Sequence, residues 1–302
     1  MFFDKSGEEI NREDLIPRKD FERLQQVVDV HQDYLNTLYV FYKFKPTPFL
    51  ERIRDLSYEL LRFVDNVCSK HDLTYWMDYG TLLGAVRHGD FVPWDDDLNV
   101  GMMRADYVRL AEILPGHIDD CGLENVSCNY GPDQKWMQIN YRGPDFADKL
   151  IGINVFPYDY VKGEAIEGIE VKYDEYGLKF ENSSQFIDDL YSQLNLTFER
   201  DEHYIPGVEG IHGKDNRFKF KIRETDLLFP LRKLQFGKYE FPAPNDSLKY
   251  IRKIHGKKFI SIPNKKPKNN RLVKYREIKS IEEILKKSCD KLKEVNDNHD
   301  FR

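Results

Sequence analysis

Apolar residues in the first part of the chain recur at three- and four-residue spacing, which is the period of one face of a helix. The pattern runs from Asp20 to about Lys45 and stops at "KPTPF", because its two prolines cannot continue a helix. It returns from Glu51 to about Lys70. We therefore predict two helices, and contact of the first stripe with a membrane surface or a partner stays open as an alternative.

From Thr74 the pattern changes to short β-like runs separated by helical ones. A helical "LLGAV" follows the first run, and a further helix is predicted over 105–114. Such an alternation is typical of a mixed α/β or α+β sheet and not of a helix bundle. The β-like runs are "TYWM", "FVPWDDDLNVGM", "NVSCNY", "WMQINYR" and "IGINVFPYDYV".

The C-terminal half is less regular. The stretch 162–220 contains a helical "SSQFIDDLYSQL" and is interpreted as an insertion that covers a site. "FPLRKLQFGKYEFPAP" predicts two paired strands with a Gly-Lys turn, "NDSLKYIRKIHG" a capped helix, and 281–295 a final helix. The predicted division is a helical extension at 1–50, a main domain at 51–265 including the insertion, and a basic loop with a helix at 266–302.

Composition narrows the functional classes. The 302 residues are 40% apolar and carry a net charge of −6, so nothing favours nucleic acid as a partner. Four scattered cysteines without a CxxC pair indicate reduced thiols. The N-terminus lacks the pattern of a secretory signal, and no apolar run is long enough to span a membrane. We expect a cytoplasmic protein.

The acidic run "WDDDLNV" is the strongest chemical signal. Side chains alternate along a strand, so Asp95, Asp97 and Asn99 are expected on one face. Carboxylates placed in this way form a hard oxygen site that suits Mg²⁺, with water and substrate phosphates completing its shell. The alternative is an acidic surface turn, but the apolar collar of Phe91 to Val100 argues against it.

A second signal lies upstream in "DYGTLLGAVRHG". Gly80 is expected where a backbone approaches a ligand closely, and Thr81 is predicted to begin a helix whose N–H groups suit a phosphate. Arg87 at the far end of that helix could also reach an anion. A Gly-Thr pair followed by an acidic strand favours metal-assisted phosphoryl or nucleotidyl transfer.

These segments resemble a known family. "YWMDYGTLLGAVRHGDFVPWDDDLNVGM" is similar to the signature of the LicD family, which includes bacterial phosphorylcholine transferases and animal fukutin and fukutin-related protein. "INVFPYDYV" resembles its third motif, and 226–263 its C-terminal region. The resemblance covers roughly 50–263. It implies an α+β fold with a DNA-polymerase-β-like nucleotidyltransferase core on a mixed sheet, here with an added N-terminal helical segment and a C-terminal extension.

The resemblance also implies an activity. Such proteins transfer a phospho-alcohol, here most simply phosphocholine, from a CDP-activated donor to a sugar hydroxyl of a cell-surface glycan or its lipid-linked precursor. Mg²⁺ is the expected cofactor and Mn²⁺ the substitute. The expected location is the cytoplasm, at the inner face of the membrane, with peripheral contact only. The candidate catalytic residues are Asp95, Asp97, Asn99 and Asn154, and the first three of them are the candidate metal ligands. The candidate donor-binding residues, chosen by residue type and position, are Gly80, Thr81, Arg87, Trp94 and Lys135.

Two positions depart from the family pattern. Asn99 and Asn154 stand where the family usually has aspartate, and an amide holds Mg²⁺ more weakly than a carboxylate. Asp159 either contributes to the site or is structural. Two further hypotheses follow, which are a catalytically silent nucleotide- or glycan-binding relative and a nucleotidyltransferase that uses a nucleoside triphosphate. For Trp76, Trp94 and Trp136 the alternatives are stacking on a ligand and core packing, and for Lys135 they are phosphate contact and solvation.

Overall fold

The chain divides into two compact units. In the computed structural model, one unit comprises Met1–Lys45 with Ile260–Pro267, and the other comprises Pro46–Phe259 with Lys268–Arg302. The first contains α1 (Arg18–Phe41), which confirms the first predicted helix, and an antiparallel pair, β1 (Phe2–Phe3) with β2 (Glu9–Ile10). The structure describes residues 2–3, 9–10, 18–41, 47–93, 95–130, 136–143, 149–163, 184–207, 222–256, 259 and 280–298.

The helices of the second unit begin and end as local chemistry requires. Thr47 caps the first of them by accepting a hydrogen bond from the Leu50 N–H, and Pro48 occupies the first turn, where its missing N–H is not needed. Among the described helices, none is both long and apolar enough to cross a membrane. The helices are α2 (Pro48–Lys70), α3 (Tyr79–His88), α4 (Arg104–Asp120), α6 (Ser184–Gln193), α7 (Ser247–His255) and α9 (Ile281–Asn298), with a short 3-10 helix, η4 (Thr225–Leu227).

Eight of the described strands form a mixed sheet around one long strand, β7, which confirms the α+β prediction. β7 runs parallel to β4 and antiparallel to β6, β8 and β9, while β3 flanks β4, β5 flanks β6 and β10 flanks β9. The strands are β3 (Tyr75–Met77), β4 (Leu98–Met103), β5 (Val126–Asn129), β6 (Met137–Arg142), β7 (Lys149–Val161), β8 (Leu196–Thr197), β9 (His203–Pro206) and β10 (Arg223–Glu224).

A separate hairpin of β11 (Arg232–Phe236) and β12 (Tyr239–Ala243) confirms the predicted strand pair. Its turn contains Gly237 at φ +60°, and a Cβ atom there would lie 2.2 Å from the Tyr58 hydroxyl oxygen of α2. Glycine is therefore required both by the backbone conformation and by the close approach of α2.

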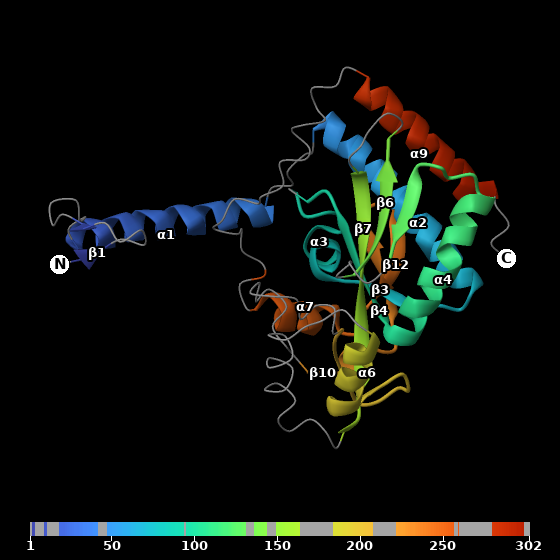
Figure 1. The fold of residues 1–302 in the computed structure, drawn as a ribbon. Helices are drawn as coiled ribbons and strands as arrows, with labels where there is room; N and C mark the ends of the chain where they lie inside the picture. The colour runs from blue at the N-terminus through green and yellow to red at the C-terminus, as the bar shows by residue number, and fades with distance from the viewer. Residues whose placement is uncertain are drawn as a thin grey trace. The chain divides into compact units, whose positions relative to one another are not determined.

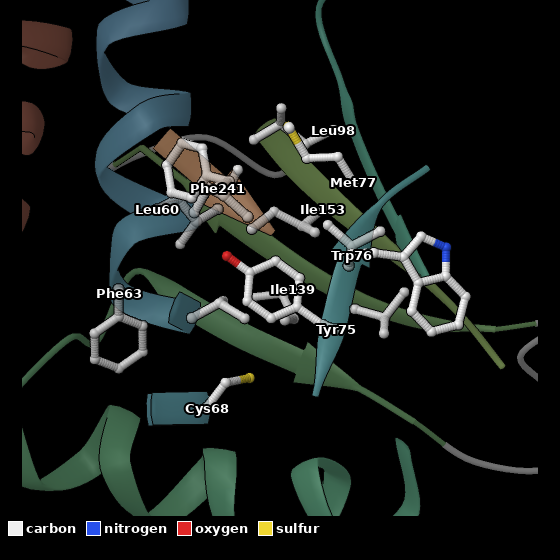
Figure 2. Packing of buried hydrophobic residues seen from close by; sticks show 14 of the residues in the cluster. Leu60, Phe63, Cys68, Tyr75, Trp76, Met77, Leu98, Ile139, Ile153 and Phe241 are labelled. Atoms are coloured by element: carbon white, nitrogen blue, oxygen red, sulfur yellow. The ribbon is translucent and has the colours of Figure 1, made fainter. Parts of the chain in front are cut away.

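The two faces of the sheet carry different side chains. Tyr75 points toward α2, whereas Trp76 points to the opposite side of β3 (Figure 2). Alternation along the strands places an apolar row on the α2 face, where α4 also packs, and α9 lies along the outer side of α2 (Figure 1). This core includes Leu60, Phe63, Met77, Leu98, Val100, Ile139, Ile153 and Val155.

On the opposite face lie the polar and aromatic residues that concern function. Asn99 and Asn154 are paired across the parallel β4 and β7 strands. Trp76 is fully buried there and donates a hydrogen bond to the Tyr250 hydroxyl of α7, so its role is core packing. The helices on this side are α3 and α7, which are in contact with one another (Figure 1).

Two local predictions are wrong. The strand predicted over 91–102 begins only at Leu98, because Pro93 has no N–H to donate and the Asp95 N–H closes a turn on the Val92 carbonyl oxygen at 2.9 Å. The helix predicted from Thr81 begins at Tyr79, because the Asp78 carboxylate caps it by accepting from the Tyr79 N–H.

Asp159 belongs to the framework and not to the acidic run. It is fully buried and accepts two hydrogen bonds of 2.8 Å from Arg104 Nε and Nη2 at the start of α4. The Tyr191 hydroxyl of α6 donates to the same carboxylate. This ion pair joins α4 to β7. Asp159 is therefore a structural residue, which was one of the two alternatives.

Candidate functional site

Four side chains from two segments converge at the start of β4. The register of β4 and β7 sets Asn99 beside Asn154, and the Asn154 Nδ2 donates to Asp97 Oδ2 at 3.3 Å and to Asn99 Oδ1 at 3.1 Å. The side chains of Asp95 and Asn99 both lie close to Gly80 in the first turn of α3. Asp95, Asp97, Asn99 and Asn154 are called the acidic cluster below.

Gly80, in the first turn of α3, makes this convergence possible. A Cβ atom at Gly80 would lie 3.0 Å from Asp95 Oδ2 and 3.4 Å from Asn99 Nδ2. Because glycine has no side chain, the acidic cluster can approach the N-terminal end of α3. The structure therefore brings together Gly80 and the four predicted catalytic residues.

The backbone around Asn99 is fixed from both directions. The Thr81 Oγ1 accepts a 2.7 Å hydrogen bond from the Asn99 N–H, and the Asp78 N–H donates to the Asn99 carbonyl oxygen at 2.9 Å. Thr81 is buried, so in this structure its hydroxyl positions the cluster instead of facing outward. These contacts hold α3 and β4 in one fixed arrangement.

Negative charge accumulates in the cluster. Burial, together with the neighbouring Asp97 and Asp96 charges, raises the pKa of Asp95 to about 7. The charges of Arg54 and Arg87 oppose this shift. A bound cation would stabilise the ionised carboxylates of the cluster.

Arg54 was missed by the sequence reasoning. It lies on α2, is buried, and donates from Nη2 to the Val92 carbonyl oxygen at 3.1 Å, with its guanidinium 5.2 Å from the centre of the Phe91 ring. The sequence offered one signal for Arg54, which is that this charged residue lies on the same face of the predicted helix as the aromatic Tyr58. Arg87, which was predicted, is half-buried and donates from Nη1 to the Phe259 carbonyl oxygen at 2.9 Å.

Trp136 determines which end of the Asn154 amide faces the cluster. The indole Nε1–H can only donate, and it donates to Asn154 Oδ1 at 3.2 Å. The amide nitrogen is therefore left to face Asp97 and Asn99. In this arrangement Asn154 supports Asp97 as a donor and does not offer an oxygen ligand.

An aromatic group flanks the cluster. The Phe156 ring packs against Trp136 with centroids 5.0 Å apart and against Tyr79 with centroids 4.9 Å apart. All three rings are half-buried. This gives the cluster one apolar side next to its charged groups.

A buried polar network supports the start of α3 from below. Asp78 is fully buried and accepts from the hydroxyls of Tyr158 and Tyr250, the latter at 3.2 Å. Arg223, also buried, donates to the same two hydroxyls at 3.3 and 2.9 Å. Burial raises the pKa of Asp78, while the Arg223 charge lowers it. No spacing in the sequence signalled this network, because its members come from four separate elements.

The donor set of the cluster fits Mg²⁺. Mg²⁺ is held by one or two carboxylates with water and phosphate oxygens completing its shell, and Asp95 and Asp97 supply two carboxylates. Within the described ranges, no group of three or more His, Cys, Asp and Glu side chains gathers as a metal site. The fit therefore rests on two carboxylates and the Asn99 amide. The predicted donor-binding residues Trp94 and Lys135 lie outside the described residues.

The raised pKa of Asp95 has a measurable consequence for metal-free protein. Above its ordinary pKa of 3.8, the unfolded state releases the proton more readily than the folded state, so the ionised Asp95 costs stability that increases as pH rises toward 7. We expect Asp95→Asn to gain stability over the unaltered protein between about pH 5 and pH 8 in EDTA, measured by urea unfolding. Asp119→Asn, which removes an exposed carboxylate from α4, is the control. A difference in unfolding free energy between Asp95→Asn and the unaltered protein that stays constant over this pH range would contradict the prediction.

Comparison with known proteins supports the resemblance. Residues 72–192 match the family described as "LicD/FKTN/FKRP, nucleotidyltransferase domain". That range begins before β3 and ends in α6, so it contains Gly80, the acidic cluster and Trp136.

Curated relatives match over shorter stretches. An uncharacterized protein of Rickettsia prowazekii is 45% identical over 58 residues, which is 19% of this chain and 22% of that protein. The lipopolysaccharide cholinephosphotransferase LicD of Haemophilus influenzae is 39% identical over 54 residues, or 18% and 20% of the two chains. Human ribitol 5-phosphate transferase FKRP is 44% identical over 48 residues, or 16% and 10%. The chain thus spans less than a quarter of the length of each of these relatives.

Proposed function

Residues 72–192 belong to the LicD/FKTN/FKRP nucleotidyltransferase family, and from this premise we propose that the protein transfers a phospho-alcohol from a CDP-activated donor to a sugar hydroxyl. Phosphocholine is the first candidate for the transferred group, and the acceptor is a cell-surface glycan or its lipid-linked precursor. The core of the proposed enzyme is of the DNA-polymerase-β type. Its proposed location is cytoplasmic, with peripheral contact at the inner face of the membrane.

The acidic cluster is the observation that carries the proposal. Asp95 lies beside the N-terminal end of α3, where helix N–H groups favour a phosphate, and Asp97 is close enough to act on its charge. Arg54 and Arg87 supply positive charge close to Asp95. A diphosphate donor needs both kinds of group.

The reaction requires one displacement. The sugar oxygen attacks the phosphorus that bears the alcohol, the bond from that phosphorus to the bridging oxygen breaks, and CMP leaves. A carboxylate of the cluster accepts the proton of the sugar hydroxyl. The half-buried Trp136 and Phe156 offer an apolar surface for the cytosine or for the alcohol.

Mg²⁺, or Mn²⁺ in its place, would be held by Asp95 and Asp97 with the Asn99 amide. When bound, such an ion stabilises the negative charge that develops on the diphosphate. The side-chain amide oxygen of Asn99 would stay within reach of the ion, because hydrogen bonds with Thr81 and Asp78 fix the Asn99 backbone.

The decisive experiment measures CMP release from CDP-choline, CDP-ribitol and CDP-glycerol in the presence of glycan acceptors, with Mg²⁺ and with EDTA. We expect CMP release from at least one donor, dependent on the divalent ion. If no donor is used with any acceptor while CDP binds in EDTA as well as in Mg²⁺, the silent binding module replaces this proposal. Pyrophosphate release from a nucleoside triphosphate would instead indicate a nucleotidyltransferase.

Restoring carboxylates at the two departures should strengthen metal binding. The double variant Asn99→Asp with Asn154→Asp removes the amide that donates to Asp97 and adds two carboxylates to the cluster. We expect its Mg²⁺ affinity to be about tenfold higher or more. Isothermal titration with Mg²⁺ gives the affinity, and CMP release gives the accompanying change in turnover. Gln138→Glu on β6, which adds one charge at the residue paired with Asn154 where the double variant adds two, is the control. Equal gains in both variants would assign the effect to charge alone.

A further inference from the structure

A cavity lies at the other end of β3 from the acidic cluster. Its volume is about 570 Å³, within the range of small-molecule sites. Tyr75, the first residue of β3, lines this cavity, whereas Asp78, directly after β3, caps α3 beside the cluster. The cavity is therefore separate from the site described above.

The cavity combines an apolar floor with a polar rim. Its floor includes the buried side chains of Cys68 and Tyr75, which lie between α2 and β3 (Figure 2). Phe229, which precedes β11, and Pro242, within β12, contribute further apolar surface. Such a wall suits the uncharged ring of a ligand.

Positive charge predominates among the lining residues. Arg200, Arg232 and Lys233 line the cavity together with a single carboxylate, Asp65. That carboxylate accepts a 2.7 Å hydrogen bond from the Tyr75 hydroxyl and lies 4.0 Å from Lys233 Nζ. The chain as a whole has a net charge of −6, so this local excess of cations runs against its bulk charge.

Two of the cations are already oriented. Arg232 Nε donates to Asn245 Oδ1 at 2.8 Å, and the Arg200 guanidinium lies 5.2 Å from the centre of the Phe229 ring. A guanidinium held in a fixed plane binds phosphate with two parallel hydrogen bonds, at a smaller loss of side-chain entropy than a free one.

We propose that this cavity binds a small phosphate ester, independently of the transfer reaction. Arg200, Arg232 and Lys233 hold the phosphate, and the uncharged ring of the ester lies against Phe229 and Pro242. A phosphorylated sugar has both parts. Free inorganic phosphate shares only the first of them.

Isothermal titration of the full chain distinguishes these cases, with glucose 6-phosphate, inorganic phosphate and glucose as probes. We expect glucose 6-phosphate to bind more tightly than inorganic phosphate, and glucose not to bind. Arg200→Gln and Lys233→Gln change exposed side chains, and each should weaken binding of the ester about tenfold. Arg109→Gln, an exposed cation on α4 outside the cavity, is the control and should leave binding unchanged.

A steric variant tests the location without changing charge. Ser69→Trp, at an exposed lining position of α2, should fill the cavity and abolish binding of glucose 6-phosphate. Absence of binding to the unaltered chain at millimolar ester would overturn the proposal. So would affinity that survives Arg200→Gln, Lys233→Gln and Ser69→Trp, or affinity that only Asp97→Ala removes, because that result would place the ester at the acidic cluster. Equal affinity for inorganic phosphate and the ester would overturn the role given to the apolar floor.

Discussion

Replacing Asp97 with asparagine is expected to lower the rate of CMP release by about 10²–10³-fold. Asp97 accepts a hydrogen bond from the Asn154 amide, and with Asp95 it is the proposed pair of acidic metal ligands. The variant keeps the shape and one oxygen of the side chain but loses its charge. The loss should therefore appear in turnover and in Mg²⁺ affinity, measured by CMP release and by isothermal titration.

The matched control is Asp119→Asn, which removes the same charge from an exposed position on α4. Circular dichroism and urea unfolding show whether Asp97→Asn keeps its fold. Removal of a like charge next to Asp95 should leave the variant at least as stable as the unaltered chain in EDTA, since the Asp97 charge raises the Asp95 pKa. Full activity in a folded Asp97→Asn variant would remove the acidic cluster from the mechanism.

The largest effect on stability is expected for Asp159→Ala, which should lower the free energy of unfolding by about 3–5 kcal/mol. The change leaves the Arg104 guanidinium, only 8% exposed, without its carboxylate in the space between α4 and β7. It also removes the acceptor of the Tyr191 hydroxyl. Urea denaturation gives the difference in free energy directly.

A double variant separates the ion pair from the packing around it. Arg104→Met with Asp159→Leu removes both charges and keeps apolar volume, so it should be less destabilised than Asp159→Ala alone. Arg109→Ala, whose partner Glu112 is exposed, should change stability by less than about 1 kcal/mol. A double variant as unstable as the single one would mean that packing, and not the unpaired charge, causes the loss.

The local pattern was sufficient for most elements of the second unit. Three- and four-residue spacing predicted α2, helical stretches at 105–114 and 281–295 predicted α4 and α9, and the Gly-Lys turn predicted the β11–β12 hairpin. It failed where a single contact outweighed the pattern. Pro93 delays the start of β4, and the Asp78 carboxylate begins α3 two residues early.

The sequence by itself determined which residue types were available for chemistry, because two aspartates one residue apart beside a Gly-Thr can be recognised without coordinates. It also placed Asn99 and Asn154 in one group, through the resemblance that their motifs carry. Trp136 decided how the Asn154 amide is oriented, and this required the neighbouring strand β6.

Only the tertiary structure decided which charges meet. Arg54 from α2 lies near Asp95, and Arg223 shares two tyrosine hydroxyls with Asp78, although each pair is far apart along the chain. The cavity lined by Asp65 and Arg200 likewise joins distant segments. The physical reason is that periodicity reports the face on which a side chain lies, whereas its partner across that face depends on strand register and helix packing.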